Sequence, residues 1–203
     1  DDLARQFNVV AKHSIEKMGA KNHDAFLSVS DITARECAYL LGKEVDVVTP
    51  NGFENDFVWS GKEYTAKRKE ARKAMIEVAE ACLSHKFEKE PLIVGTSGRY
   101  EFHNKGLDIF FDALKALENS GKLEREVLAY VTVPAANLGA RHDLQAHLQD
   151  KSQPIDVSQY RYSTHVLENT AWDQVANAIN GSVLDRAESK VKVIFVPTYL
   201  NQN

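Results

Sequence analysis

The chain has 203 residues, enough for one sizeable domain or two small ones, and chains of this length bury roughly 70% of their unfolded surface. Its composition is 43% hydrophobic and 27% charged, and its net charge of -4 gives no general attraction to nucleic acid or anionic membranes. No apolar run approaches the roughly 20 residues of a membrane span, so we expect a cytoplasmic protein without nucleic-acid or membrane partners.

Strand-like and helix-like segments alternate along the chain, a pattern that favours an α/β fold with a mostly parallel sheet. Residues 2–18 carry apolar positions at helical spacing and predict one amphipathic helix. The segment "AFLSVS" predicts a short strand. The segment "SDITARECAYLLG" predicts a helix that begins after Ser30 or Asp31 and ends at Gly42. The segment "VDVVTPNG" predicts a strand that runs into a turn.

The second half of the chain has the clearer pattern. Residues 65–87 predict a long helix whose basic first half we interpret as a solvated face, because glutamates interleave with the lysines and arginines. The segments "PLIVGT", "EVLAYVTVP" and "VKVIFVP" predict buried strands, and "GLDIFFDALKALENSG" predicts a helix between the first two. Buried strands separated by crossovers indicate the opening half of a nucleotide-binding α/β domain.

The loop "GTSGRYEFHNKG" leaves the first of these strands, where ligands bind in doubly wound sheets. Gly98 and Gly106 allow the backbone to approach an anion, Arg99 offers a planar bidentate donor, and Lys105 adds a point charge. The helix that follows would direct its N-terminal dipole at the same place. These features suit a diphosphate, although such turns also occur without a ligand, and the loop fits neither GxGxxG nor the P-loop motif.

Three segments together resemble one enzyme family. "GRYEFHNKG" is similar to the "GRYEF-NKG" signature of glycogen synthases of the fungal and animal type, which are retaining glycosyltransferases with two Rossmann-like domains. "FLSVSDITARE" resembles the family's "FTTVSQITA-E", and "VKVIFVPTYL" resembles a strand of its C-terminal domain. The resemblance covers about residues 13–111 and 191–200.

The resemblance implies roles for particular residues. Arg99 and Lys105, with Gly98 and Gly106, would contact the diphosphate of UDP-glucose, and glucose would pass to the non-reducing end of an α-1,4-glucan without a metal or cofactor. Pro50, Asn51 and Gly52 would form the interdomain hinge.

The same resemblance implies that the chain consists of three parts. Residues 1–52 would be the C-terminal end of the N-terminal domain together with the hinge. Residues 53–90 would be a linker and long helix, and residues 91–203 would be the first half of the C-terminal domain. The last part would contain a variable helical insertion at about 135–188, to which we assign no chemical role.

The sequence also departs from the family pattern. It has no counterpart of the family's N-terminal lysine-glycine loop or of the "PSYYEPWGYTP-E" region with its expected catalytic carboxylate. We therefore expect an interior fragment with no catalytic residue, inactive alone, of a bacterial-like enzyme without sugar-phosphate regulation. Uncovered strand edges would favour a homo-oligomer.

Two other interpretations remain open: a noncatalytic α/β anion-binding or scaffolding module, and another two-domain glycosyltransferase such as a sucrose-linked enzyme. Cys37 and Cys82 are predicted to be small buried hydrophobes, and the histidines show no metal-ligand spacing. Trp59 and Trp172 could stack on a sugar ring, but each also suits a packing role.

Overall fold

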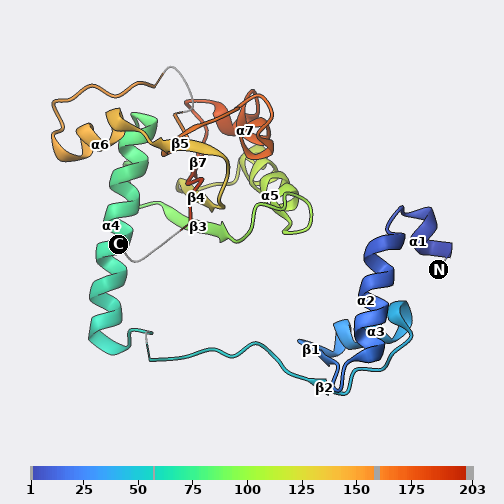
Figure 1. Ribbon diagram of the computed structural model, residues 1–203. Helices are drawn as coiled ribbons and strands as arrows, with labels where there is room; N and C mark the ends of the chain where they lie inside the picture. Colours follow the sequence, from blue (N-terminus) through green and yellow to red (C-terminus); the bar gives the residue numbers. More distant parts are fainter. Residues whose placement is uncertain (1, 57, 158–160, 200–203) are drawn as a thin grey trace. The chain divides into compact units, whose positions relative to one another are not determined.

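The computed structural model describes residues 2–56, 58–157 and 161–199, and the chain divides into two compact units, Asp1–Trp59 and Ser60–Asn203 (Figure 1). The elements of the first unit are α1 (Asp2–Gln6), α2 (Val10–Asn22), β1 (Leu27–Ser28), α3 (Asp31–Leu41) and β2 (Val47–Val48). β1 and β2 pair in parallel, with Leu27 opposite Val47.

The single helix predicted over residues 2–18 is wrong, because α1 and α2 are separate. Asn8 adopts a left-handed φ of 53°, and the Val9 N–H donates to the Ala4 carbonyl at 2.8 Å, which ends α1 before α2 begins. The large apolar side chains of this region are not buried either. In the described part of the first unit the buried hydrophobic residues are Ala4 and Ala20.

The helix α3 confirms its predicted signals. The Ser30 hydroxyl accepts a hydrogen bond from the Thr33 N–H at 3.1 Å, which satisfies a donor of the first turn. Gly42 takes the left-handed conformation after the last turn, and its N–H donates to the Ala38 carbonyl at 3.1 Å.

The second unit contains the long helix and the main sheet. Its elements are α4 (Gly61–Leu83), β3 (Leu92–Ser97), α5 (Leu107–Asn119), β4 (Val127–Thr132), β5 (Asn137–Ala140), α6 (His142–Gln149), β6 (His165–Leu167), α7 (Gln174–Ile179), the 3-10 turn η1 (Val183–Asp185) and β7 (Val191–Phe195). The main sheet has the order β3-β4-β7, and both of its pairings are parallel.

Both faces of this sheet are covered, which is why its strands read as continuous apolar runs. Along β4, Val127, Ala129 and Val131 pack with α5 and α7, whereas Leu128 and Tyr130 pack with α4 and α6. Figure 1 shows α4 and α5 on opposite sides of the strands. The second unit is therefore a Rossmann-like α/β layer structure, as the sequence predicted.

The crossover from β4 to β7 is more than a helical insertion. β5 and β6 form an antiparallel ribbon, with Asn137 opposite Leu167, and this pairing was not predicted from the sequence. The crossover also pairs with the end of β7, because Ser163 forms a parallel bridge with Phe195. The expectation that strand edges are uncovered is therefore wrong at Phe195.

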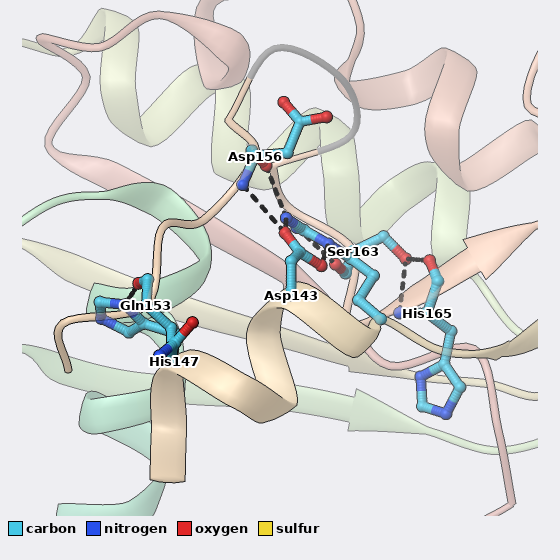
Figure 2. Close-up of polar contacts among 7 residues, drawn as sticks. Asp143, His147, Gln153, Asp156, Ser163 and His165 are labelled. Atoms are coloured by element: carbon cyan, nitrogen blue, oxygen red, sulfur yellow. Dashed lines mark hydrogen bonds and ion pairs between the residues drawn. The ribbon is translucent and has the colours of Figure 1, made fainter. Parts of the chain in front are cut away.

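A buried arginine, Arg141, holds the crossover together, and Figure 2 labels its partners Asp143, Asp156 and Ser163. The Arg141 guanidinium donates to both carboxylate oxygens of Asp143, at 3.2 and 2.6 Å, and to the carbonyls of Asp156 at 2.6 Å and Ser163 at 3.3 Å. Burial raises the pKa of Asp143, but hydrogen bonds from Arg141 and from the Asp156 N–H, with the Arg141 charge, bring it below its ordinary value. This network fixes the start of α6 to the chain that leads into β6.

Candidate functional site

The loop of residues 98–106 lies at the carboxyl edge of the main sheet, between β3 and α5. Ser97 ends β3 opposite Thr132 at the end of β4, so the carboxyl ends of the parallel strands meet at this edge. In doubly wound folds this edge is where ligands bind. The loop therefore occupies the place that the sequence predicted.

Short backbone hydrogen bonds give the loop its shape. The Glu101 N–H donates to the Arg99 carbonyl at 2.8 Å, and the Lys105 N–H donates to the Glu101 carbonyl at 2.9 Å. Gly106 follows with a left-handed φ of 66°, a conformation that is strained for a residue with a side chain. A Cβ atom placed on Gly106 would have no other atom within 4 Å. Open space likewise surrounds the Cβ position of Gly98. Both glycines thus leave the backbone accessible.

Two aromatic residues anchor the loop to the core, and sequence reasoning missed their role. The Tyr100 hydroxyl accepts a hydrogen bond from the Val175 N–H at 2.9 Å, and the Tyr100 ring meets Phe195 edge-on. Burial raises the pKa of Tyr100, so this phenol stays protonated. Phe102 stacks on Phe111 with ring centroids 6.3 Å apart. The alternation of aromatic and polar residues in "RYEFHNK" is the signal that could have indicated these anchors.

The cationic side chains of the loop are exposed to solvent. Arg99 is 72% exposed, and its Nε lies 3.1 Å from a carboxylate oxygen of Glu101. Lys105 is also exposed, and within the described residues its ammonium has no ion-pair partner. His103 pairs with Asp108 at 2.8 Å, and that hydrogen bond, followed by one from the Ile109 N–H, lowers the pKa of Asp108. The loop thus presents two cations, one of them with a neighbouring carboxylate.

The N-terminus of α5 offers less to an anion than the sequence suggested. The Leu107 N–H and Asp108 N–H both donate to the Phe102 carbonyl, at 2.9 and 3.4 Å. The Ile109 N–H donates to the Asp108 carboxylate at 2.9 Å. Because these groups already have acceptors, the helix can contribute its dipole but not these hydrogen bonds.

The predicted hinge residues belong to the other unit. Pro50, Asn51 and Gly52 follow β2 as exposed, irregular backbone. The boundary between the two compact units falls after Trp59, a few residues beyond this turn.

A large cavity of the second unit does not include the loop. It has a volume of about 1220 Å³ and runs along α4, with His147 of α6 at its border, and it is lined largely by lysine, arginine and glutamate side chains. Several of these charges are paired, as Arg72 is with Glu90 and Lys151 with Glu77. This groove fits the expected solvated face of α4.

The described residues contain neither a metal cluster nor a membrane-spanning helix. Among those residues, no three histidine, cysteine or acidic side chains gather where they could hold a metal ion. No helix there combines the length and apolar character that a membrane crossing requires. Cys82 is buried, and burial raises the pKa of its thiol to about 12, whereas Cys37 is partly exposed.

Comparisons with known proteins point to one family. Residues 1–146 match a family model described as glycogen synthase. The chain is 31% identical over 144 residues to a glycogen (starch) synthase of Dictyostelium discoideum, covering 67% of this chain and 16% of that protein. It is 26% identical over 194 residues to glycogen (starch) synthase isoform 2 of Saccharomyces cerevisiae, covering 92% of this chain and 25% of that protein.

A human relative gives a similar result. The chain is 32% identical over 142 residues to the liver glycogen (starch) synthase of Homo sapiens, covering 66% of this chain and 20% of that protein. The chain therefore spans between about a sixth and a quarter of the length of these relatives.

Proposed function

Because the chain belongs to the glycogen synthase family, we propose that it forms part of an enzyme that transfers glucose from UDP-glucose to the non-reducing end of an α-1,4-glucan. The observation that carries this proposal is the loop at the carboxyl edge of the parallel sheet. It is anchored by Tyr100 and Phe102, and it presents Arg99 and Lys105 to solvent.

In this proposal the loop binds the diphosphate of the donor. Arg99 exchanges its contact with Glu101 for phosphate oxygens, and Lys105 supplies a second positive charge. Both charges would neutralise the UDP that departs as the glycosidic bond breaks, so no metal is needed for this step. The accessible backbone at Gly98 and Gly106 admits the phosphates at close range.

Further parts of the proposal concern organisation. Residues 1–52 would end one Rossmann-like domain with Pro50, Asn51 and Gly52 as its hinge, residues 53–90 would link the domains, and residues 91–203 would open the donor-binding domain. The 203 residues alone would be inactive, because they supply donor contacts without a residue assigned to catalysis. We also propose that the enzyme is cytoplasmic and that it forms a homo-oligomer.

Donor binding can be tested directly on this chain. Calorimetric titration with UDP should show binding that Arg99→Ala and Lys105→Ala each weaken at least tenfold, or about 1.4 kcal/mol. Lys122→Ala, which removes an exposed lysine beyond the far end of α5, is the matched control and should leave binding unchanged. Silent substitutions at Arg99 and Lys105 would refute the site assignment.

Activity is tested separately. Glucose transfer from UDP-glucose to glycogen should be measured with a protein that contains the whole chain, and each substitution should lower kcat/KM at least tenfold. A protein that transfers nothing from UDP-glucose or ADP-glucose would instead favour a noncatalytic anion-binding or scaffolding module.

A further inference from the structure

A small cavity lies beside the start of β7, at the opposite end of the strands from the loop of residues 98–106. Lys192 and Val193 of β7 line it, and its other walls come from the end of α4, from η1 and from the crossover at Arg161 and Tyr162. Its volume is about 80 Å³, far below the roughly 300 Å³ of a site for a drug-sized molecule. A few water molecules or one small ion can occupy such a space, whereas a sugar phosphate cannot.

Lys192 brings a buried cation to this cavity. The residue is 5% exposed, and its ammonium donates to the Ala187 carbonyl at 2.7 Å. An ammonium carries three donors, and within the part of the chain that the structure describes Lys192 makes no ion pair. Burial lowers the pKa of Lys192 below its ordinary value, because the charged form lacks solvent. An anion beside the ammonium would supply both acceptors and compensating charge.

Two arginines add to the positive charge of the cavity. Arg161 donates to the Asp185 carbonyl, and its Nη2 lies 3.6 Å from the Asp185 carboxylate. Arg186 also lines the cavity, is exposed, and has no side-chain partner among the described residues. Arg161, Arg186 and Lys192 are three cations against the single carboxylate of Asp185, so the described lining carries a surplus of two positive charges.

Two neighbouring carboxylates do not remove this surplus, because each is engaged outside the cavity. Glu126 pairs with His85 at 2.7 Å, and Glu118 accepts a hydrogen bond from the Val191 N–H at 2.9 Å. Neither glutamate lines the cavity. The cavity therefore differs from the groove along α4, where lysines and arginines alternate with glutamates that pair with them.

We propose that this cavity binds inorganic phosphate between Lys192, Arg161 and Arg186. Charge-assisted hydrogen bonds from ammonium and guanidinium groups suit the phosphate oxygens, and the cavity admits a small ion while excluding a sugar. Bound there, the ion would join β7, η1 and the crossover, and would stabilise the second unit without taking part in glucose transfer. The inference is independent of the proposed function, because the loop of residues 98–106 lies at the other end of the strands.

Phosphate binding can be measured without a contribution from that loop. The whole chain should carry Arg99→Ala and Lys105→Ala, which remove the two exposed cations of the loop. Thermal unfolding in about 10 mM phosphate should then occur at least about 2 °C higher than in chloride of equal ionic strength, because a ligand of the native state stabilises it. Glucose 6-phosphate at the same concentration should give no such shift. Calorimetric titration with phosphate should show saturable binding.

Two variants in the same background show whether the cavity is responsible. Arg186→Ala, at an exposed position, should weaken phosphate binding about threefold or more. Lys192→Met keeps an apolar stem but removes the ammonium, and should abolish the phosphate-dependent shift. Arg125→Ala is the matched control, because it removes an exposed arginine just before β4, outside the lining, and should leave binding unchanged.

Each alternative result contradicts the proposal. Equal phosphate binding in Arg186→Ala and Arg125→Ala would place the ion elsewhere, and this comparison holds even if Lys192→Met fails to fold. A shift that chloride reproduces would indicate general screening of charge. An equal shift with glucose 6-phosphate would point to a larger, more open site. None of these results bears on UDP binding through Arg99 and Lys105, so the proposed function stands or fails separately.

Discussion

The pair formed by Arg141 and Asp143 allows a prediction whose magnitude follows from its burial. The Arg141 side chain is 7% exposed and the Asp143 side chain is 28% exposed. Removing one partner of a fully buried pair costs about 3–5 kcal/mol, whereas an exposed pair contributes about 0–1 kcal/mol. Because Asp143 is partly exposed, we expect Asp143→Ala to lower the free energy of unfolding by about 2–3 kcal/mol.

A double-mutant cycle isolates the interaction itself. Asp143→Ala, Arg141→Ala and the double variant should be compared by urea unfolding followed by circular dichroism, and the coupling energy should be about 2 kcal/mol. Lys151→Ala removes an exposed ion pair with Glu77 and serves as the control, with no change expected. A coupling energy below about 0.5 kcal/mol would refute the argument that burial strengthens this pair.

Three further predictions concern the loop and β6. Tyr100→Phe should lower the free energy of unfolding by about 1–2 kcal/mol in urea titration, because the Val175 N–H loses its acceptor; an unchanged midpoint would show that water replaces it. Gly106→Ala should cost about 1–2 kcal/mol in thermal unfolding because φ is 66°, whereas Gly52→Ala, without such a φ, should cost less; equal effects would contradict this. Burial lowers the pKa of His165 below 6.5, so its contribution to the free energy of unfolding is complete above about pH 6.5 and is lost as the pH falls toward the folded pKa. His165→Gln should reduce this loss of stability at low pH in urea titrations performed at several pH values. If the free energy of unfolding of the variant falls equally steeply with pH, His165 is not the source of the loss.

The features that the sequence predicted correctly are those with local causes. The strands of the main sheet could be recognised because burial on both faces requires uninterrupted apolar runs. The helix α3 could be placed because Ser30 and Gly42 act within one turn of its ends. The loop of residues 98–106 could be located because it directly follows a recognisable strand.

Apart from one local backbone conformation, the features that could not be predicted depend on distant contacts. The break between α1 and α2 rests on the left-handed Asn8, which apolar spacing does not reveal. The β5–β6 ribbon is short, and the Asn137 amide that fixes it donates to the Pro197 carbonyl at 2.7 Å, far along the chain. Arg141 likewise meets the Ser163 carbonyl only in the folded crossover. In the candidate site, the Tyr100 contact with Val175 is hidden for the same reason.

The two strand pairs of the main sheet are separated by different lengths of chain, and this difference affects the order in which they fold. β3 joins β4 with Leu92 opposite Val127, whereas β4 joins β7 with Val127 opposite Val191, nearly twice as far along the chain. Doubling a closed loop costs about 0.6 kcal/mol of chain entropy, and parallel pairing across a long crossover is slow. The β3-α5-β4 segment should therefore acquire protection first during refolding. Pulse-labelling hydrogen exchange should then find the Ile194 amide of β7 protected last in the sheet.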